Sequence, residues 1–142
     1  MDSKINIILA YLEKHNSLHK MADAKAYVVL VILGFIGWQV MNIISGIVSF
    51  LNKLSQFSIV LVVLSIIVLV ISYIISLIFA IKTLFSITGS TKGNIFEQMM
   101  YDFHTNLKIT YYKFKDVKWA VWSMIIALFT FIILYGFYKF YK

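Results

Sequence analysis

Three long stretches of this chain contain no charged residue, and they constrain its fold more than any other feature. They cover residues 26–52, 54–81 and 119–138. A helix crosses the hydrocarbon core of a bilayer with roughly 20 apolar residues, so each stretch is long enough to span it. We therefore predict three transmembrane helices, at about residues 26–51, 57–85 and 117–138.

The composition points to the same class of protein. Hydrophobic residues make up 61% of the chain, charged residues make up 13%, and the mean hydropathy is +0.88. Soluble domains average about 45–50% apolar and about 25% charged residues, and a small fold leaves much of its chain exposed. These values argue against a soluble enzyme and indicate an integral membrane protein. The chain has no cysteine, which excludes disulfides, thiolate metal sites and cysteine nucleophiles.

The distribution of lysines predicts the orientation in the membrane. Ten of the 13 lysines lie in residues 1–25 and 82–118, which share one side of a three-span protein, and the other three lie on the opposite side. Because lysine is enriched on the cytoplasmic side of membranes, we expect the N-terminus and residues 82–118 in the cytoplasm. The C-terminus then faces outward, to the periplasm or the cell exterior. The net charge of +7 favours anionic lipid headgroups as partners, and we expect no DNA or RNA partner.

Two segments outside the spans are predicted to be helical. In residues 3–20, apolar side chains recur at the spacing of an amphipathic helix, which would lie on the membrane surface or pack on the second cytoplasmic segment. After a turn-prone cluster at residues 88–93, Asn94 and Glu97 have the spacing of a helix cap. A helix is predicted from about residue 95 into the third span, because no glycine or proline interrupts it before Gly136.

The predicted fold is an all-α integral membrane protein. It has three transmembrane helices, an N-terminal amphipathic helix, and a cytoplasmic juxtamembrane helix that continues into the last span. Its expected parts are a cytoplasmic amphipathic helix (1–25), a hairpin of two transmembrane helices (26–85), a cytoplasmic linker and helix (86–116), and the third transmembrane helix with a short tail (117–142).

Polar and small side chains inside the spans indicate contacts between helices. Gln39 and Asn42 lie in the first span, where amides usually find partners on other helices. They are interpreted as packing or oligomer contacts, and a polar stripe lining a pore is the alternative. Ser72, Ser76 and Ala80 repeat at every fourth residue, a spacing that allows close helix packing. A unit with several such faces is expected to form a homo-oligomer.

Polar residues near the first span have two interpretations. His15, His19 and Asp23 follow one another at four-residue spacing, as metal ligands do on helices, but without a firm third ligand we expect no metal. Asp23 and Lys25 form either a solvated interfacial pair, with Lys25 reaching to the headgroups, or a functional pair. In the functional interpretation Asp23 contacts a lysine of the second cytoplasmic segment or a ligand.

The second cytoplasmic segment mixes aromatic residues and lysines, among them Lys108, Tyr111 and Lys113. Such side chains can stack a base and hold a phosphate, or they form the buried face and interfacial belt of a juxtamembrane helix. The sequence contains no recognisable catalytic set, phosphate-binding loop or pair of carboxylates at one site. We therefore expect neither an enzyme nor a cofactor.

Residues 18–26 carry a resemblance to a known family. Their sequence, Leu-His-Lys-Met-Ala-Asp-Ala-Lys-Ala, leads into an apolar span that contains Gly34 and Gly37. This stretch resembles the entry to the first transmembrane helix in membrane effectors of the Pycsar antiphage systems, which often carry an Ala-Asp-x-Lys-Ala signature. Residues 96–113 and the apolar span after them are similar to the closing helix of those effectors, with Lys113 near a recurring lysine.

The resemblance implies a bacterial inner-membrane effector. In that family a cyclase makes a cyclic pyrimidine mononucleotide during phage infection, and the effector then compromises the membrane in abortive infection. Asp23, Lys25 and Lys113 match the family-like positions, and with Lys108 and Tyr111 they are the candidates for ligand binding or gating. The sequence shows no separate cyclic-nucleotide-binding domain, so the ligand, and whether it binds this chain directly, stay open. A related nucleotide second messenger, such as an oligonucleotide, would suit the same architecture. Two other functions also stay open: a holin-like pore former or small channel without a nucleotide ligand, and a scaffold subunit of a larger membrane complex.

Overall fold

A computed structural model describes residues 2–50, 54–85 and 95–141 of the chain. These residues form three helices: α1 (Asp2–Phe50), α2 (Gln56–Leu84) and α3 (Ile95–Tyr141). Each helix is long and apolar enough to cross a membrane. For the described residues this confirms the predicted all-α fold with three helices that are long and apolar enough to span a membrane.

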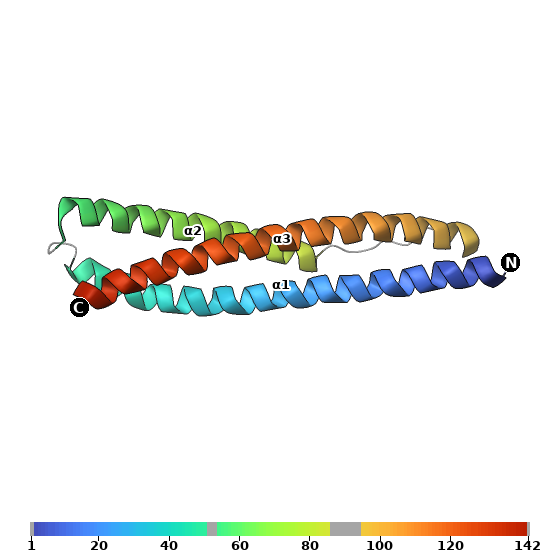
Figure 1. The fold of residues 1–142 in the computed structure, drawn as a ribbon, viewed down its shortest axis with the longest axis horizontal. Coiled ribbons are helices and arrows are strands. Elements are labelled where there is room, and N and C mark those ends of the chain that lie inside the picture. Colours follow the sequence, from blue (N-terminus) through green and yellow to red (C-terminus); the bar gives the residue numbers. More distant parts are fainter. Residues whose placement is uncertain (1, 51–53, 86–94, 142) are drawn as a thin grey trace.

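The three helices form an elongated bundle (Figure 1). α1 and α3 run in the same direction and α2 runs in the opposite direction, so the two termini lie at opposite ends. The first halves of α1 and α3 extend past the last residue of α2 (Figure 1). Among the described residues, one end of the molecule therefore consists of α1 and α3 alone, while the rest contains all three helices.

The predicted N-terminal helix is not a separate element. α1 continues from Asp2 through the junction at residues 25–26 without a break, because no glycine or proline precedes Gly34 to interrupt the backbone hydrogen bonds. α3 likewise begins at Ile95 and runs into the third span, as the sequence predicts. The predicted turn at residues 88–93 and the cap at Asn94 lie outside the described residues. Which parts of these helices lie in the cytoplasm stays a prediction.

Small residues hold the helices close together. The stripe Ser72, Ser76 and Ala80 is buried, and the Ser76 hydroxyl donates a hydrogen bond of 2.8 Å to the carbonyl of Ala120 on α3. The predicted close contact therefore lies within one chain, between α2 and α3. Near the other end of the bundle the ring of Tyr138 lies directly against Gly46, where any side chain on α1 would overlap it.

Three apolar clusters follow one another along the part of the bundle in which α2 packs with α1 and α3. One cluster joins Ile43 and Ile47 of α1 to Leu69 of α2 and Leu134 of α3. A second surrounds four buried residues in the middle of the bundle, and a third lies where the bundle narrows to α1 and α3. Their buried members are Val29, Leu33, Ala80 and Ala120 in the second, and Ala22, Ala26 and Val117 in the third.

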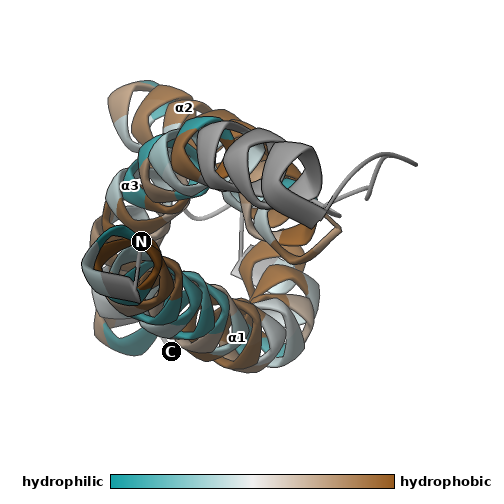
Figure 2. Cartoon of the chain, turned by 90° about the vertical axis from the view of Figure 1, so that its right-hand side faces the viewer, coloured by the Kyte–Doolittle hydropathy of each residue, from teal (hydrophilic) through white to brown (hydrophobic). Residues whose placement is uncertain are grey.

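The outer surface of the bundle is also apolar. α2 contains a single charged residue, Lys82, whereas hydrophilic turns are visible on α1 and α3 (Figure 2). Trp38 and Phe57 are 72% and 75% exposed, and many valine, leucine and isoleucine side chains around the bundle point outward with them. Continuous apolar surface of this kind is unfavourable in water. It suits a bundle whose outer face contacts lipid.

Candidate functional site

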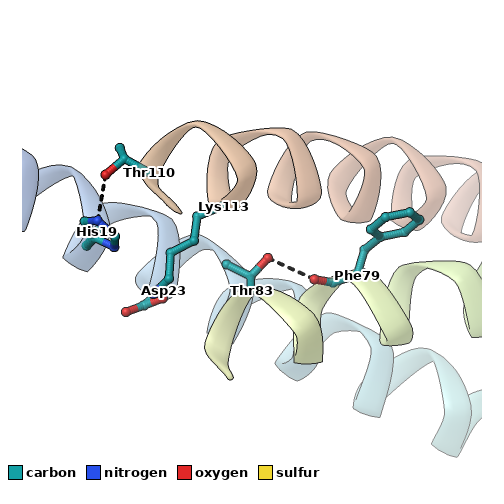
Figure 3. Close-up of polar contacts among 6 residues, drawn as sticks. All are labelled: His19, Asp23, Phe79, Thr83, Thr110 and Lys113. Carbon is teal, nitrogen blue, oxygen red and sulfur yellow. Dashed lines mark hydrogen bonds and ion pairs between the residues drawn. The ribbon is translucent and has the colours of Figure 1, made fainter. Parts of the chain in front are cut away.

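Charged side chains join α1 and α3 at the level where α2 ends. Lys113 reaches from α3 toward Asp23 of α1, and its Nζ lies 2.8 Å from the Asp23 Oδ1 (Figure 3). The Lys113 side chain is only 5% exposed and the Asp23 side chain is 34% exposed. An ammonium that has left water needs a charged or hydrogen-bonding partner, and Asp23 is that partner here.

A second polar contact lies one turn further toward the N-terminal end of the bundle. The His19 Nε2 and the Thr110 Oγ1 are 2.6 Å apart, within hydrogen-bonding distance (Figure 3). His19 precedes Asp23 by four residues and Thr110 precedes Lys113 by three, so both contacts lie on the same faces of α1 and α3. Together they form two polar contacts, one helical turn apart, between these helices.

A second ion pair joins α3 to α2 at nearly the same level. The Nζ of Lys82 lies 3.3 Å from the Asp116 Oδ2 and 3.4 Å from its Oδ1. Asp116 is buried, with its side chain 6% exposed, while Lys82 is 60% exposed and also lies over the ring of Phe79. Asp116 follows Lys113 by three residues, so one turn of α3 supplies a cation to α1 and an anion to α2.

We name the residues of these three contacts the polar collar: His19, Asp23, Lys82, Thr110, Lys113 and Asp116. The buried member of each ion pair belongs to α3. Breaking a buried ion pair by removing one partner typically costs about 3–5 kcal/mol, because the remaining charge stays buried without compensation. Each pair therefore opposes a shift of α3 against its partner helix, because such a shift would leave a buried charge uncompensated.

The structure brings together two of the predicted site residues. Asp23 contacts a lysine of the segment 86–116, as the functional interpretation of that acid predicts, and the lysine is Lys113. Lys25, Lys108 and Tyr111 are exposed, and among the described residues none of them contacts this pair. Their predicted role in ligand binding or gating is not tested by these contacts.

Sequence reasoning missed the other half of the polar collar. Asp116 directly precedes the third apolar stretch, just as Asp23 lies shortly before the first, and the whole chain has only six acidic residues. This similarity of position was the one sign in the sequence that Asp116, like Asp23, has a partner on another helix. Thr110 gave none, because a single threonine in a polar helix is compatible with an exposed site.

The amides predicted inside the membrane lie on α1. Gln39 is half-buried and Asn42 is exposed, and the side chain of neither makes a hydrogen bond within the described part of the chain. Neither the packing interpretation nor the pore interpretation is decided by this placement. Among the described residues, no group of three histidine, cysteine or acidic side chains is arranged to hold a metal ion.

No protein-family model matches this sequence, and no curated protein and no solved structure matches the chain. Its function must therefore be inferred from its own contacts. Those contacts define a three-helix membrane protein whose helices are joined by charged side chains at one level of the bundle.

Proposed function

We propose that this chain is an effector of bacterial antiphage defence that oligomerises in the inner membrane and permeabilises it in response to a cyclic nucleotide. The observation that carries the proposal is the ion pair between Asp23 and Lys113. It joins the two helices that extend past α2, and it lies where their apolar spans begin. A signal received by the extending halves reaches the membrane-spanning halves through this pair.

The proposed response to the ligand requires only a shift between two arrangements of α1 and α3. In the resting arrangement the polar collar is closed, as it is here. A ligand that binds better to an arrangement with the collar open moves the equilibrium by the difference between its two affinities. A shift from 1% to 99% open requires roughly a 10⁴-fold difference in affinity.

The resemblance to Pycsar membrane effectors supports the same proposal. Two of its three family-like positions, Asp23 and Lys113, are 90 residues apart in sequence and 2.8 Å apart in space. A contact between the acid of the short signature and the recurring lysine of the closing helix gives both positions a physical reason to recur. The proposed ligand is accordingly a cyclic pyrimidine mononucleotide.

The placement of the Asn42 side chain supports the proposed homo-oligomer. Its side chain is exposed on the membrane-spanning part of α1 and makes no hydrogen bond within the described chain. An amide in hydrocarbon gains by pairing across helices, and the asparagine of a second copy offers both a donor and an acceptor. In chemical cross-linking of membranes, Asn42→Leu should reduce the oligomer, while Met41→Leu at the neighbouring exposed position should not. Equal cross-linking of both variants would contradict the Asn42 contact.

The proposed orientation places the N-terminus and the extending halves of α1 and α3 in the cytoplasm. The distribution of lysines supports this orientation, because ten of the 13 lysines lie in residues 1–25 and 82–118, on the side proposed to be cytoplasmic. The C-terminus then lies in the periplasm or outside the cell. In this orientation the polar collar faces the compartment in which a cyclase would release its product.

The direct test is dye release from vesicles that contain the purified protein. Cyclic CMP and cyclic UMP are added separately, with linear 5′-CMP as a control that has the same base, sugar and phosphate but lacks the cyclic phosphodiester. The proposal predicts release with at least one cyclic nucleotide and none with the linear one. Release without any nucleotide would instead favour a holin-like pore, and no release under any condition, including with Asp23→Ala, would favour a scaffold subunit.

A further inference from the structure

A groove runs along the outer face of α3 beside the polar collar. Its volume is about 650 Å³, and the described residues that line it are Tyr111, Phe114, Lys115, Lys118, Trp119 and Trp122. All six belong to one helix and recur at intervals of three or four residues, so they form one continuous stripe. The volume lies within the range of about 300–1,000 Å³ that is common for small-molecule sites.

The charged groups of this groove are all cationic. Lys115 and Lys118 are exposed and, within the described chain, neither forms an ion pair. The nearest acid in sequence, Asp116, is buried and turned to Lys82 of α2. The groove therefore offers two ammonium groups, a tyrosine hydroxyl and two indole N–H groups, which are the donors that a phosphate needs.

The same groove becomes apolar along its length. Trp119 and Trp122 lie one to two turns beyond Lys115 and are 53% and 56% exposed. The ring of Trp119 stacks on Phe79 of α2 at a centroid distance of 6.5 Å, which holds it in place. From Trp119 onward α3 is free of charge until Lys139. A ligand in the groove thus meets the two lysines in its middle and indole rings toward the uncharged part of α3, with Tyr111 and Phe114 at the opposite end.

We propose that this groove binds an anionic phospholipid. The phosphate contacts Lys115 and Lys118, and an acyl chain lies along Trp119 and Trp122. Lysine ammonium groups at the headgroup level attract anionic lipid, and indole rings prefer this interfacial depth. The site requires only that α3 crosses a membrane, and it does not depend on a nucleotide signal or on pore formation.

A bound lipid would fix the depth of α3 next to the polar collar. Lys113 and Asp116 lie on the opposite side of the same turns that carry Lys115 and Lys118. A phosphate held on the outer side therefore resists movement of the turn that carries both ion pairs. Lipid composition is thereby expected to bias the resting arrangement.

Tryptophan fluorescence tests the site in the full-length protein. The chain has three tryptophans, so Trp38→Phe leaves only the two that line the groove. The variant is reconstituted in phosphatidylcholine vesicles that contain a small, equal fraction of either brominated phosphatidylglycerol or brominated phosphatidylcholine, whose bromine atoms quench tryptophan on contact. We expect a selectivity of about fivefold or more for phosphatidylglycerol, because one lysine near an anionic headgroup contributes roughly that factor.

Two variants distinguish a specific phospholipid site from general electrostatic attraction to anionic lipid. Lys115→Ser/Lys118→Ser should remove the selectivity, while Lys139→Ser at the other end of α3 should retain it. Unchanged emission in phosphatidylcholine alone checks that the variants are folded. Equal quenching by both lipids, or selectivity that survives loss of both groove lysines, would overturn the proposal. Displacement of brominated phosphatidylglycerol by cyclic CMP or inorganic phosphate would also overturn it, because the groove would then hold a soluble phosphate.

Discussion

The two members of the Asp23–Lys113 pair are buried to different extents. The lysine side chain is 5% exposed and the aspartate side chain is 34% exposed. Water can therefore compensate the aspartate when the lysine is removed, but it cannot equally compensate the lysine when the aspartate is removed. Because of this asymmetry, replacing one partner should destabilise the protein more than replacing the other, which is not expected for an exposed ion pair.

Replacing Asp23 is predicted to destabilise the bundle more than replacing Lys113. Asp23→Ala leaves a buried ammonium unpaired and should cost about 3–5 kcal/mol. Lys113→Met keeps the apolar stem and should cost less. The double variant Asp23→Ala/Lys113→Met should be more stable than Asp23→Ala alone, because it removes the unpaired charge. Thermal unfolding in detergent measures all three, and losses that simply add would show that the residues act separately.

The sequence predicts one side of this contact better than the other. An acid among few acids, placed just before an apolar span, indicates that Asp23 needs a partner. Which lysine it meets depends on the register of α1 against α3, and no local pattern specifies that register. For the same reason the pairing of Asp116 with Lys82, two residues at the ends of different spans, was not predicted.

At the scale of the elements, helix continuity is readable from the sequence and helix packing is not. Residues 95–141 form one helix as predicted, because nothing in that stretch breaks the backbone hydrogen bonds. The stripe of Ser72, Ser76 and Ala80 correctly predicts a close helix contact. Whether the contact lies within the chain or between chains cannot be read from spacing, and the hydrogen bond from Ser76 to Ala120 is what places it inside.

Two glycines of α1 should respond oppositely to the same substitution. At Gly46 a side chain would overlap the ring of Tyr138, whereas at Gly34 no atom lies within 4 Å of an added Cβ. Gly46→Val is therefore predicted to cost about 1–3 kcal/mol by overpacking, while Gly34→Val should change stability little. Thermal unfolding of both variants in the same detergent checks this, and equal effects would mean that α1 and α3 do not approach closely at Gly46.

The whole molecule has two parts that differ in how many helices they contain. Composition and hydropathy predict three spans, and the described helices agree. The sequence did not predict that the N-terminal segment would continue α1, since its apolar residues suit either a surface helix or a helix packed on α3. The contacts of His19 and Asp23 with α3 decide for packing.

The proposed orientation makes a prediction for the intact cell. Because the chain has no cysteine, single cysteines report their side without background. Ser17→Cys, on the extending half of α1, should be protected from a membrane-impermeant maleimide, while Gln56→Cys at the start of α2 should be labelled. Both positions are exposed in the bundle. Labelling of both from outside would contradict the orientation inferred from the lysines.

The central claim is that separation of α1 from α3 at the polar collar permeabilises the membrane, and a reversible lock tests it most directly. His19→Cys/Thr110→Cys places two thiols where the wild-type side chains are in contact, and a short reagent bridges them. Asp23→Ala is added to open the adjacent ion pair, and dye release is measured in vesicles before and after bridging. We predict release from the unbridged triple variant and none from the bridged one. Equal release from both would show that the membrane is permeabilised without movement at the collar, and would contradict the account.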